Sequence, residues 1–160
     1  MASNDCWIYQ MASRLTCEIL EVMAGVKLTK WPTGDSSTKM DTVYGLVSGK
    51  DDIQIQFEAD PKLFARMARN MIGGEPEDEF EVQEYAAEIF NVLCGRIVSE
   101  LCDASKTVLH FRPIEYKAYS DEEPMEYSHA LDTLYFKSDN DEFARLSWSR
   151  ESVESLIGGE

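Results

Sequence analysis

Residues 79–103, EFEVQEYAAEIFNVLCGRIVSELCD, carry the longest helical pattern in this chain. A helix advances by about 100° per residue, so apolar side chains that recur every three or four residues gather on one side. That apolar side consists of Val82, Ala86, Ile89, Leu93 and Ile97. A stripe with this period indicates a helix that packs one face against a core. We therefore expect one long helix here, with this face turned toward a sheet.

The opposite side of the same helix is polar. It carries Glu84, Glu88, Asn91 and Gly95. Exposed Glu and Asn side chains usually belong to a solvated helix face with no further function. Gly95 argues against that interpretation, because a glycine inside a helix costs about 1 kcal/mol relative to alanine and its neighbours on the helical wheel are small or apolar. We interpret this side as a shallow docking surface, on which Glu88 and Asn91 can address one small target together.

The remaining segments predict an α+β domain. A first amphipathic helix, capped by Asn4 or Asp5, precedes Gly25, a second helix starts at Asp60-Pro61, and residues 150–160 add one short helical turn. The expected strands are residues 26–31, 42–47, 53–57, 108–119, 129–137 and 143–149. This order lacks a regular βαβ alternation. We therefore expect a single domain over residues 1–160, in which an antiparallel β-sheet is covered by long helices.

Two of these strands predict a hairpin. Residues 42–47 and 53–57 flank a turn-like sequence at 48–51. In the second strand, apolar residues alternate strictly with Gln54 and Gln56. Such alternation indicates antiparallel strands with one buried and one solvated face.

Composition narrows the classes of partner. A chain of 160 residues with 44% hydrophobic residues can bury a substantial core. Its net charge of −15 argues against binding to nucleic acid or to an anionic membrane, because both would repel it and no basic run is present. No apolar run is long enough to span a membrane, and the N-terminus lacks a basic start followed by an apolar core. We expect a cytoplasmic protein with a protein or small-molecule partner.

The metal-binding residue types form no recognisable site in the sequence. The four cysteines, Cys6, Cys17, Cys94 and Cys102, include no C-x-x-C pair, which is typical of reduced thiols used for packing. His110 and His129 have no Cys, His or acid at ligand spacing. The run Asp139-Asn140-Asp141-Glu142 lacks the central glycine and the downstream glutamate of a calcium loop, so it predicts a hairpin turn. We expect no metal bound by this chain itself.

The sequence Glu84-Tyr-Ala-Ala-Glu88-Ile-Phe-Asn91-Val-Leu-Cys-Gly95 resembles the signature helix of the CheC/CheX/FliY chemotaxis phosphatases and is most similar to that of CheX. The resemblance covers most of the chain, since the glycines that end the first two helices and the strands after Pro113 fall where this family places them. Glu84 stands where the family has Asp or Ser.

This resemblance implies a function in two-component signalling. The family implies hydrolysis of the aspartyl phosphate of a CheY-like receiver domain, with Asn91 orienting the attacking water and Glu88 anchoring a lysine of the receiver. Glu84 and Gly95 would contact the partner. The resemblance implies no cofactor of the chain's own and a divalent metal, Mg, on the receiver. A carboxylate suits an ammonium group, and an amide can both donate to and accept from a water.

Two other functions stay open at this level. The chain can be a non-catalytic module of the same fold that docks on a receiver or a flagellar-switch protein. It can also be a homodimerising scaffold whose exposed strand edge lies in residues 108–119 or in the last two strands. The resemblance itself implies a homodimer formed through the sheet.

Overall fold

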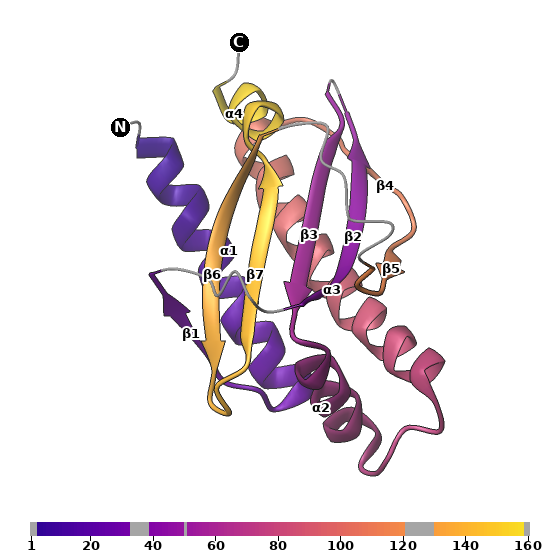
Figure 1. The fold of residues 1–160 in the computed structure, drawn as a ribbon. Helices are drawn as coiled ribbons and strands as arrows, with labels where there is room; N and C mark the ends of the chain where they lie inside the picture. The colour runs from indigo at the N-terminus through magenta and orange to yellow at the C-terminus, as the bar shows by residue number, and fades with distance from the viewer. Residues whose placement is uncertain (1–2, 33–38, 50, 121–129, 159–160) are drawn as a thin grey trace.

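Helix α3, Glu79–Ser105, lies across one face of an antiparallel sheet in the computed structural model, which describes residues 3–32, 39–49, 51–120 and 130–158 (Figure 1). The other helices are α1 Ser3–Ala24, α2 Pro61–Ile72 and α4 Arg150–Gly158. The strands are β1 Leu28–Trp31, β2 Asp41–Ser48, β3 Ile53–Ala59, β4 His110–Phe111, β5 Glu115–Lys117, β6 Leu131–Ser138 and β7 Phe143–Ser149. The predicted order of elements is confirmed.

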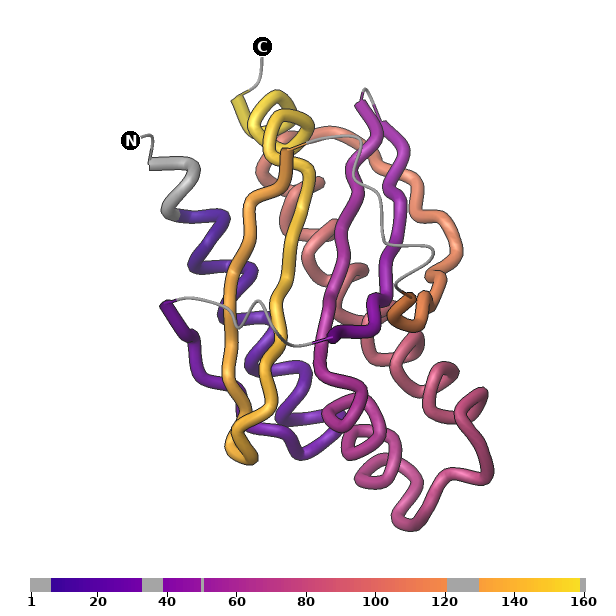
Figure 2. Tube along the Cα trace, viewed as in Figure 1, coloured from indigo at the N-terminus to yellow at the C-terminus, as the bar shows by residue number. Residues whose placement is uncertain are grey.

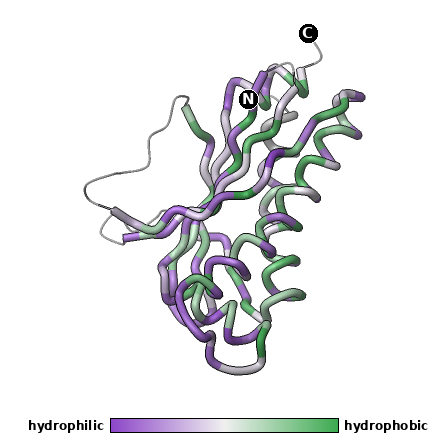
Figure 3. Tube along the Cα trace, turned by 90° about the vertical axis from the view of Figure 1, so that its right-hand side faces the viewer, coloured by the Kyte–Doolittle hydropathy of each residue, from purple (hydrophilic) through white to green (hydrophobic). Residues whose placement is uncertain are grey.

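In the described part of the chain, seven strands form one sheet in the order β1-β6-β7-β3-β2-β4, and β5 also pairs with β2. Every pairing is antiparallel. The chain trace shows β6 and β7 side by side, between β1 and β3 (Figure 2), and a view from the side shows α3 on one side of the strands (Figure 3). The α+β class with an antiparallel sheet is therefore confirmed. The proposal of a free edge in the last two strands is wrong, because the edges are β1 and the β4–β5 side.

The predicted hairpin is present, but one part of its expected solvated face is buried. Strands β2 and β3 pair from Asp41 opposite Ala59 to Val47 opposite Ile53. Gln56 is 0% exposed and Glu58 is 5% exposed, although both point away from the apolar side of β3.

Their polar groups are satisfied by neighbours on the same face of the sheet. Gln56 Nε2 donates to Glu58 Oε1 at 3.1 Å, and the guanidinium of Arg145 on β7 donates to both Glu58 oxygens at 2.8 and 3.0 Å. Buried polar groups are tolerated where they are paired in this way.

Residues 108–119 form two short strands instead of the single strand expected. Strands β4 and β5 both pair with β2, and they are separated by Arg112 to Ile114. Pro113 lies in this break, where it cannot donate a hydrogen bond to a ladder. The Arg112 N–H still donates to Leu46 O at 3.1 Å. The proline therefore explains why the pairing with β2 stops and resumes.

The ends of α2 follow the local sequence closely. Asp60 is the N-cap, its carboxylate accepts from Lys62 N at 2.9 Å, and Pro61 occupies the first turn. Gly73 ends the helix in the left-handed conformation, with φ of 80°. Both predicted boundaries of α2 are confirmed.

Two other helices are longer than expected. Asn4 and Asp5 already lie inside α1, so the prediction that one of them caps this helix is wrong. The expected single turn after β7 is the nine-residue helix α4, and its Val153 is buried in the core. An apolar contact with the core accounts for the additional turns, because short helices gain most of their stability from packing.

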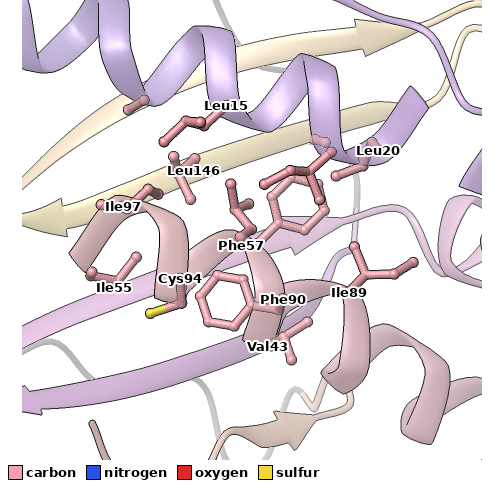
Figure 4. Packing of buried hydrophobic residues seen from close by; sticks show 14 of the residues in the cluster. Leu15, Leu20, Val43, Ile55, Phe57, Ile89, Phe90, Cys94, Ile97 and Leu146 are labelled. Carbon is pink, nitrogen blue, oxygen red and sulfur yellow. The ribbon is translucent and has the colours of Figure 1, made fainter. Parts of the chain in front are cut away.

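The core lies between the sheet and helices α1 and α3. Figure 4 shows Leu15 and Leu20 of α1 facing the sheet, with Phe90 of α3 close to Phe57 and Val43. These side chains are at most 2% exposed. Truncation of such large buried side chains to alanine usually costs about 2–5 kcal/mol of stability. The orientation of α3 is thus fixed by the core.

Tyr116 of β5 provides a test of how the sheet edge next to α3 is held. Its hydroxyl donates to Asp41 Oδ2 at 2.5 Å, and burial together with this bond raises the pKa of Tyr116 above the ordinary value of 10.0. A raised pKa means that the neutral phenol stabilises the folded state below pH 10 and that this stabilisation is lost as the pH rises further. We expect Tyr116→Phe to lower the free energy of unfolding at neutral pH by about 1.5–3 kcal/mol.

The pH dependence of this difference in the free energy of unfolding tests the account. In urea unfolding experiments, the difference between wild type and Tyr116→Phe should be constant below about pH 10 and shrink above it. Tyr135→Phe on β6 is the control, since the Tyr135 hydroxyl makes no hydrogen bond within the described part of the chain. A difference that grows above pH 10 would contradict this account.

Candidate functional site

The four predicted site residues lie on α3, opposite the side that contacts the core. Glu84, Glu88 and Asn91 are exposed, and Gly95 is half-buried. The buried side is wider than the stripe expected from the sequence, and it contains Ala86, Ile89, Phe90, Leu93, Cys94, Ile97, Val98 and Leu101. The predicted division of this helix into a core face and a surface face is confirmed.

Glu84, Glu88 and Asn91 make no side-chain hydrogen bond or ion pair with any residue in the described ranges. Other polar residues near the start of α3 do have structural partners. Asp78 is the N-cap and accepts from Glu81 N at 2.9 Å, and Glu81 accepts from Glu77 N at 3.0 Å. The fold therefore uses the acids at the helix start and leaves Glu84, Glu88 and Asn91 available for a partner.

Nothing among the described residues requires a glycine at position 95. A Cβ atom built on it would meet no heavy atom within 4 Å, apart from its own helix backbone and chain neighbours. The glycines with positive φ in the described chain are Gly25 and Gly73, so the backbone at Gly95 does not require glycine. Neither close packing nor backbone conformation explains a residue that weakens the helix.

Two neighbouring elements border this face of α3. On one side, Arg14 of α1 approaches Glu100 of α3 at 3.5 Å. On the other side, Phe111 and Ile114 of the β4–β5 segment pack over Gly45 of β2, next to Cys94 of α3. The exposed face is thus a strip of helix surface between α1 and the β4–β5 segment.

A surface hollow of about 400 Å³ lies elsewhere, between the start of α2 and the β6–β7 turn. It is lined by Asp60, Lys62, Ala65, Arg69, Asn140, Asp141 and Glu142, and it shares no residue with the exposed face of α3. Small-molecule sites are usually concave and mostly apolar. An exposed helix face suits a macromolecular partner better than a small ligand.

His110, Cys17, Cys94 and Cys102 lie apart from this face or contact the core. His110 is exposed on β4, and His129 falls outside the described residues. Cys17, Cys94 and Cys102 are free thiols, and burial raises the pKa of Cys94. Among the described residues, no group of three or more His, Cys, Asp and Glu side chains could hold a metal ion. Such a buried neutral thiol is a packing residue.

Comparison with known proteins identifies the class of fold. Protein-family models give no match, and a search of curated protein sequences gives none either. Solved structures of CheX, CheC-like and FliY chemotaxis proteins match the chain, with TM-scores of 0.70 and 0.68 for a CheX and a CheC-like protein. The architecture is therefore the CheX/CheC-like α+β fold.

Three structures illustrate this likeness. The CheX-CheY-BeF3-Mg complex from Borrelia burgdorferi contains a chain with a TM-score of 0.70 and 15% identity, covering 89% of this chain and 96% of that one. FliY from Thermotoga maritima has a TM-score of 0.67 and 16% identity, covering 95% and 91%. The FliM middle domain from H. pylori has a TM-score of 0.62 and 12% identity, covering 100% of both chains. The resemblance seen in the α3 sequence is thus confirmed for the fold.

In the part of the chain that the structure describes, no helix has the length and apolar character needed to cross a bilayer.

Substitution of Gly95 tests whether the fold has any need for this glycine. We expect Gly95→Ala to raise the free energy of unfolding by about 0.5–1 kcal/mol, because alanine favours the helix. Gly73→Ala is the matched control, since a Cβ there also meets nothing within 4 Å but the φ of 80° disfavours alanine. That control should lose about 1–2 kcal/mol. Thermal unfolding of both variants measures the two effects, and a destabilised Gly95→Ala protein would reveal an intramolecular role.

Proposed function

We propose that this protein is a chemotaxis phosphatase that hydrolyses the aspartyl phosphate of a CheY-like receiver domain. The observation that carries the proposal is that Glu88 and Asn91 are exposed on a helix fixed by the core and have no side-chain partner among the described residues. The fold is shared with the chain of the Borrelia burgdorferi complex that contains CheY, BeF3 and Mg. In this proposal α3 lies over the phosphorylation pocket of the receiver.

Glu88 anchors the receiver. Its carboxylate accepts a charge-assisted hydrogen bond from the lysine ammonium next to the phosphoryl group. Asn91 lies three residues further along the same face, so the two Cβ atoms are about 5–6 Å apart. One side chain can therefore hold the receiver's lysine while the other reaches the phosphorus.

Asn91 orients the attacking water. Its side-chain amide can accept from the water and donate to a second oxygen without a change of charge. An acyl phosphate has a good leaving group, and phosphoryl transfer depends mainly on positioning and on neutralising charge. No strong base is required of this chain, and the receiver supplies the Mg ion.

Glu84 and Gly95 border this pair on the same helix face. Glu84 adds a second exposed carboxylate one turn before Glu88. The absence of a side chain at Gly95 lets the receiver backbone approach the helix closely. This use of Gly95 accounts for a glycine that the fold itself does not need.

A second candidate function is docking without hydrolysis. The same fold occurs in the FliM middle domain, and Glu84 stands where the phosphatase family has Asp or Ser. In this alternative the face of α3 binds a receiver or a flagellar-switch protein and leaves the phosphate in place. Retained binding with an unchanged phosphate lifetime would favour it.

We also propose a homodimer formed through the sheet. The edges available for strand pairing among the described elements are β1 and the β4–β5 side. Analytical ultracentrifugation should give twice the mass of the chain at micromolar concentration. A monomer mass across the whole accessible concentration range would exclude this assembly without affecting the proposed catalysis.

Asn91→Ala tests the catalytic proposal. The wild-type protein should accelerate phosphate release from a phosphorylated CheY-like receiver, and Asn91→Ala should abolish the acceleration while the receiver still binds. Asn140→Ala is the matched control, since it removes an exposed amide from the β6–β7 turn. Glu88→Ala should mainly raise KM, because it removes a contact made before the reaction. An Asn91→Ala protein as active as wild type would rule out this role.

A further inference from the structure

Phe80 is an exposed aromatic side chain at the start of α3. It is 67% exposed, and Figure 1 shows the first turns of α3 extending past the edge of the sheet. Phe80 precedes Glu84 by four residues and Asn91 by eleven. At these spacings the three side chains project from the same face of the helix. Along the helix axis, Phe80 and Asn91 are about 16 Å apart. One standard interface of about 800 Å² per partner can cover both.

The surroundings of Phe80 are acidic. Between Arg69 and Arg96 the chain has seven Asp and Glu residues and no Lys or Arg. Local structure explains some of these acids, because Asp78 caps α3 and acids in the first turn favour the positive end of the helix dipole.

Local structure does not explain Glu84 and Glu88. Both lie beyond the first turn, where the dipole effect has faded. Neither has a partner among the described residues. Like charges that stay unpaired on one face lower the stability of a helix slightly, so their placement favours a partner of opposite charge.

We propose that Phe80 is an anchor that selects the receiver, and that it inserts into an apolar pocket with a rim of Lys and Arg side chains on the receiver. This inference rests on the proposed function and names the chemistry of its partner. Interfaces concentrate their binding energy in a few buried aromatic residues surrounded by polar groups. An exposed Phe with an acidic border matches that arrangement, and its complement is a pocket with a basic border.

This anchor also resolves an electrostatic conflict. The chain carries a net charge of −15, and the phosphorylation pocket of a receiver contains carboxylates. Attraction over the pocket itself is therefore weak. An apolar anchor at about 16 Å from the reacting group, together with a basic rim on the partner, provides affinity at a place where no carboxylates of the pocket oppose it.

Steady-state kinetics with a phosphorylated CheY-like receiver separate the anchor from the catalytic residues. We expect Phe80→Ala to raise KM about tenfold or more with kcat unchanged, since loss of a hot-spot residue has this size. Phe80→Leu, which keeps an apolar side chain, should recover most of the affinity. Val108→Ala is the matched control, because Val108 is 76% exposed and lies beyond the opposite end of α3; its KM should equal that of wild type.

A variant of Glu84 tests the proposed contact with the basic rim of the receiver's pocket. Glu84→Gln should raise KM two- to fivefold and weaken the dependence of KM on salt, as expected for a charge at the border of an interface. Thermal unfolding should give the wild-type midpoint for both the Phe80 and the Glu84 variants, because these side chains are exposed.

Binding to the receiver activated with beryllofluoride distinguishes a failure of this inference from a failure of the proposed function. Binding that is weakened by Phe80→Ala, without any phosphate release by wild type, would overturn the catalytic proposal and keep the anchor. If wild type releases phosphate, and Phe80→Ala binds the receiver and releases phosphate equally well, the anchor would be overturned and the catalytic proposal kept.

Discussion

The contact between the apolar side of α3 and the inner face of the sheet fixes the position of every other feature of the candidate site. Phe90 of α3 lies in this contact, close to Val43 of β2 and Phe57 of β3 (Figure 4). Rotation of α3 by one residue, about 100°, would expose large apolar side chains and drive unpaired carboxylates toward the core. Burial of an unpaired charge is far more costly than most other changes in a fold. The outward direction of Glu88 is therefore set by packing on the opposite side of the same helix.

A site built in this way differs from one carried by a loop. The backbone of α3 is held by its own hydrogen bonds and by eight buried side chains, so the spacing between Glu88 and Asn91 cannot change without unwinding the helix. Rigid elements hold functional groups more accurately than loops do. In the reaction that we propose, which depends on orienting one water, this rigidity is the main contribution that the protein can make. The cap at Asp78 and the left-handed residue Lys106 define the two ends of that rigid segment.

The sequence was most informative where local rules decide the outcome. The alternation around Gln54 and the Asp60-Pro61 start predicted a hairpin and a helix boundary that the structure contains. The burial of Gln56 could not be predicted, because alternation identifies a second face but not the partners that satisfy it. The place of β6 and β7 between β1 and β3 depends on pairing between distant segments, which no local pattern encodes.

For the candidate site, the helical wheel separated the exposed residues from the buried ones correctly, but it left Phe80 unnoticed. Phe is among the residue types most often buried, and Phe80 is exposed. Its angular position close to Glu84 is the signal that could have revealed it. The proposed roles of Glu88 and Asn91 came from resemblance and from chemistry, since exposure alone says nothing about what a side chain binds.

Within the described part of the chain, Glu88 and Asn91 have no side-chain partner, and this has a consequence for how the protein can evolve. Residues that contribute little to folding are free to change over generations without loss of the native state, since surface substitutions of this kind usually alter stability by at most about 0.5 kcal/mol. A lineage with this architecture could therefore gain or lose its chemistry by single substitutions while its shape persists. Shape alone would then be a poor guide to which descendants have the proposed phosphatase activity, and the two side chains themselves would carry that record.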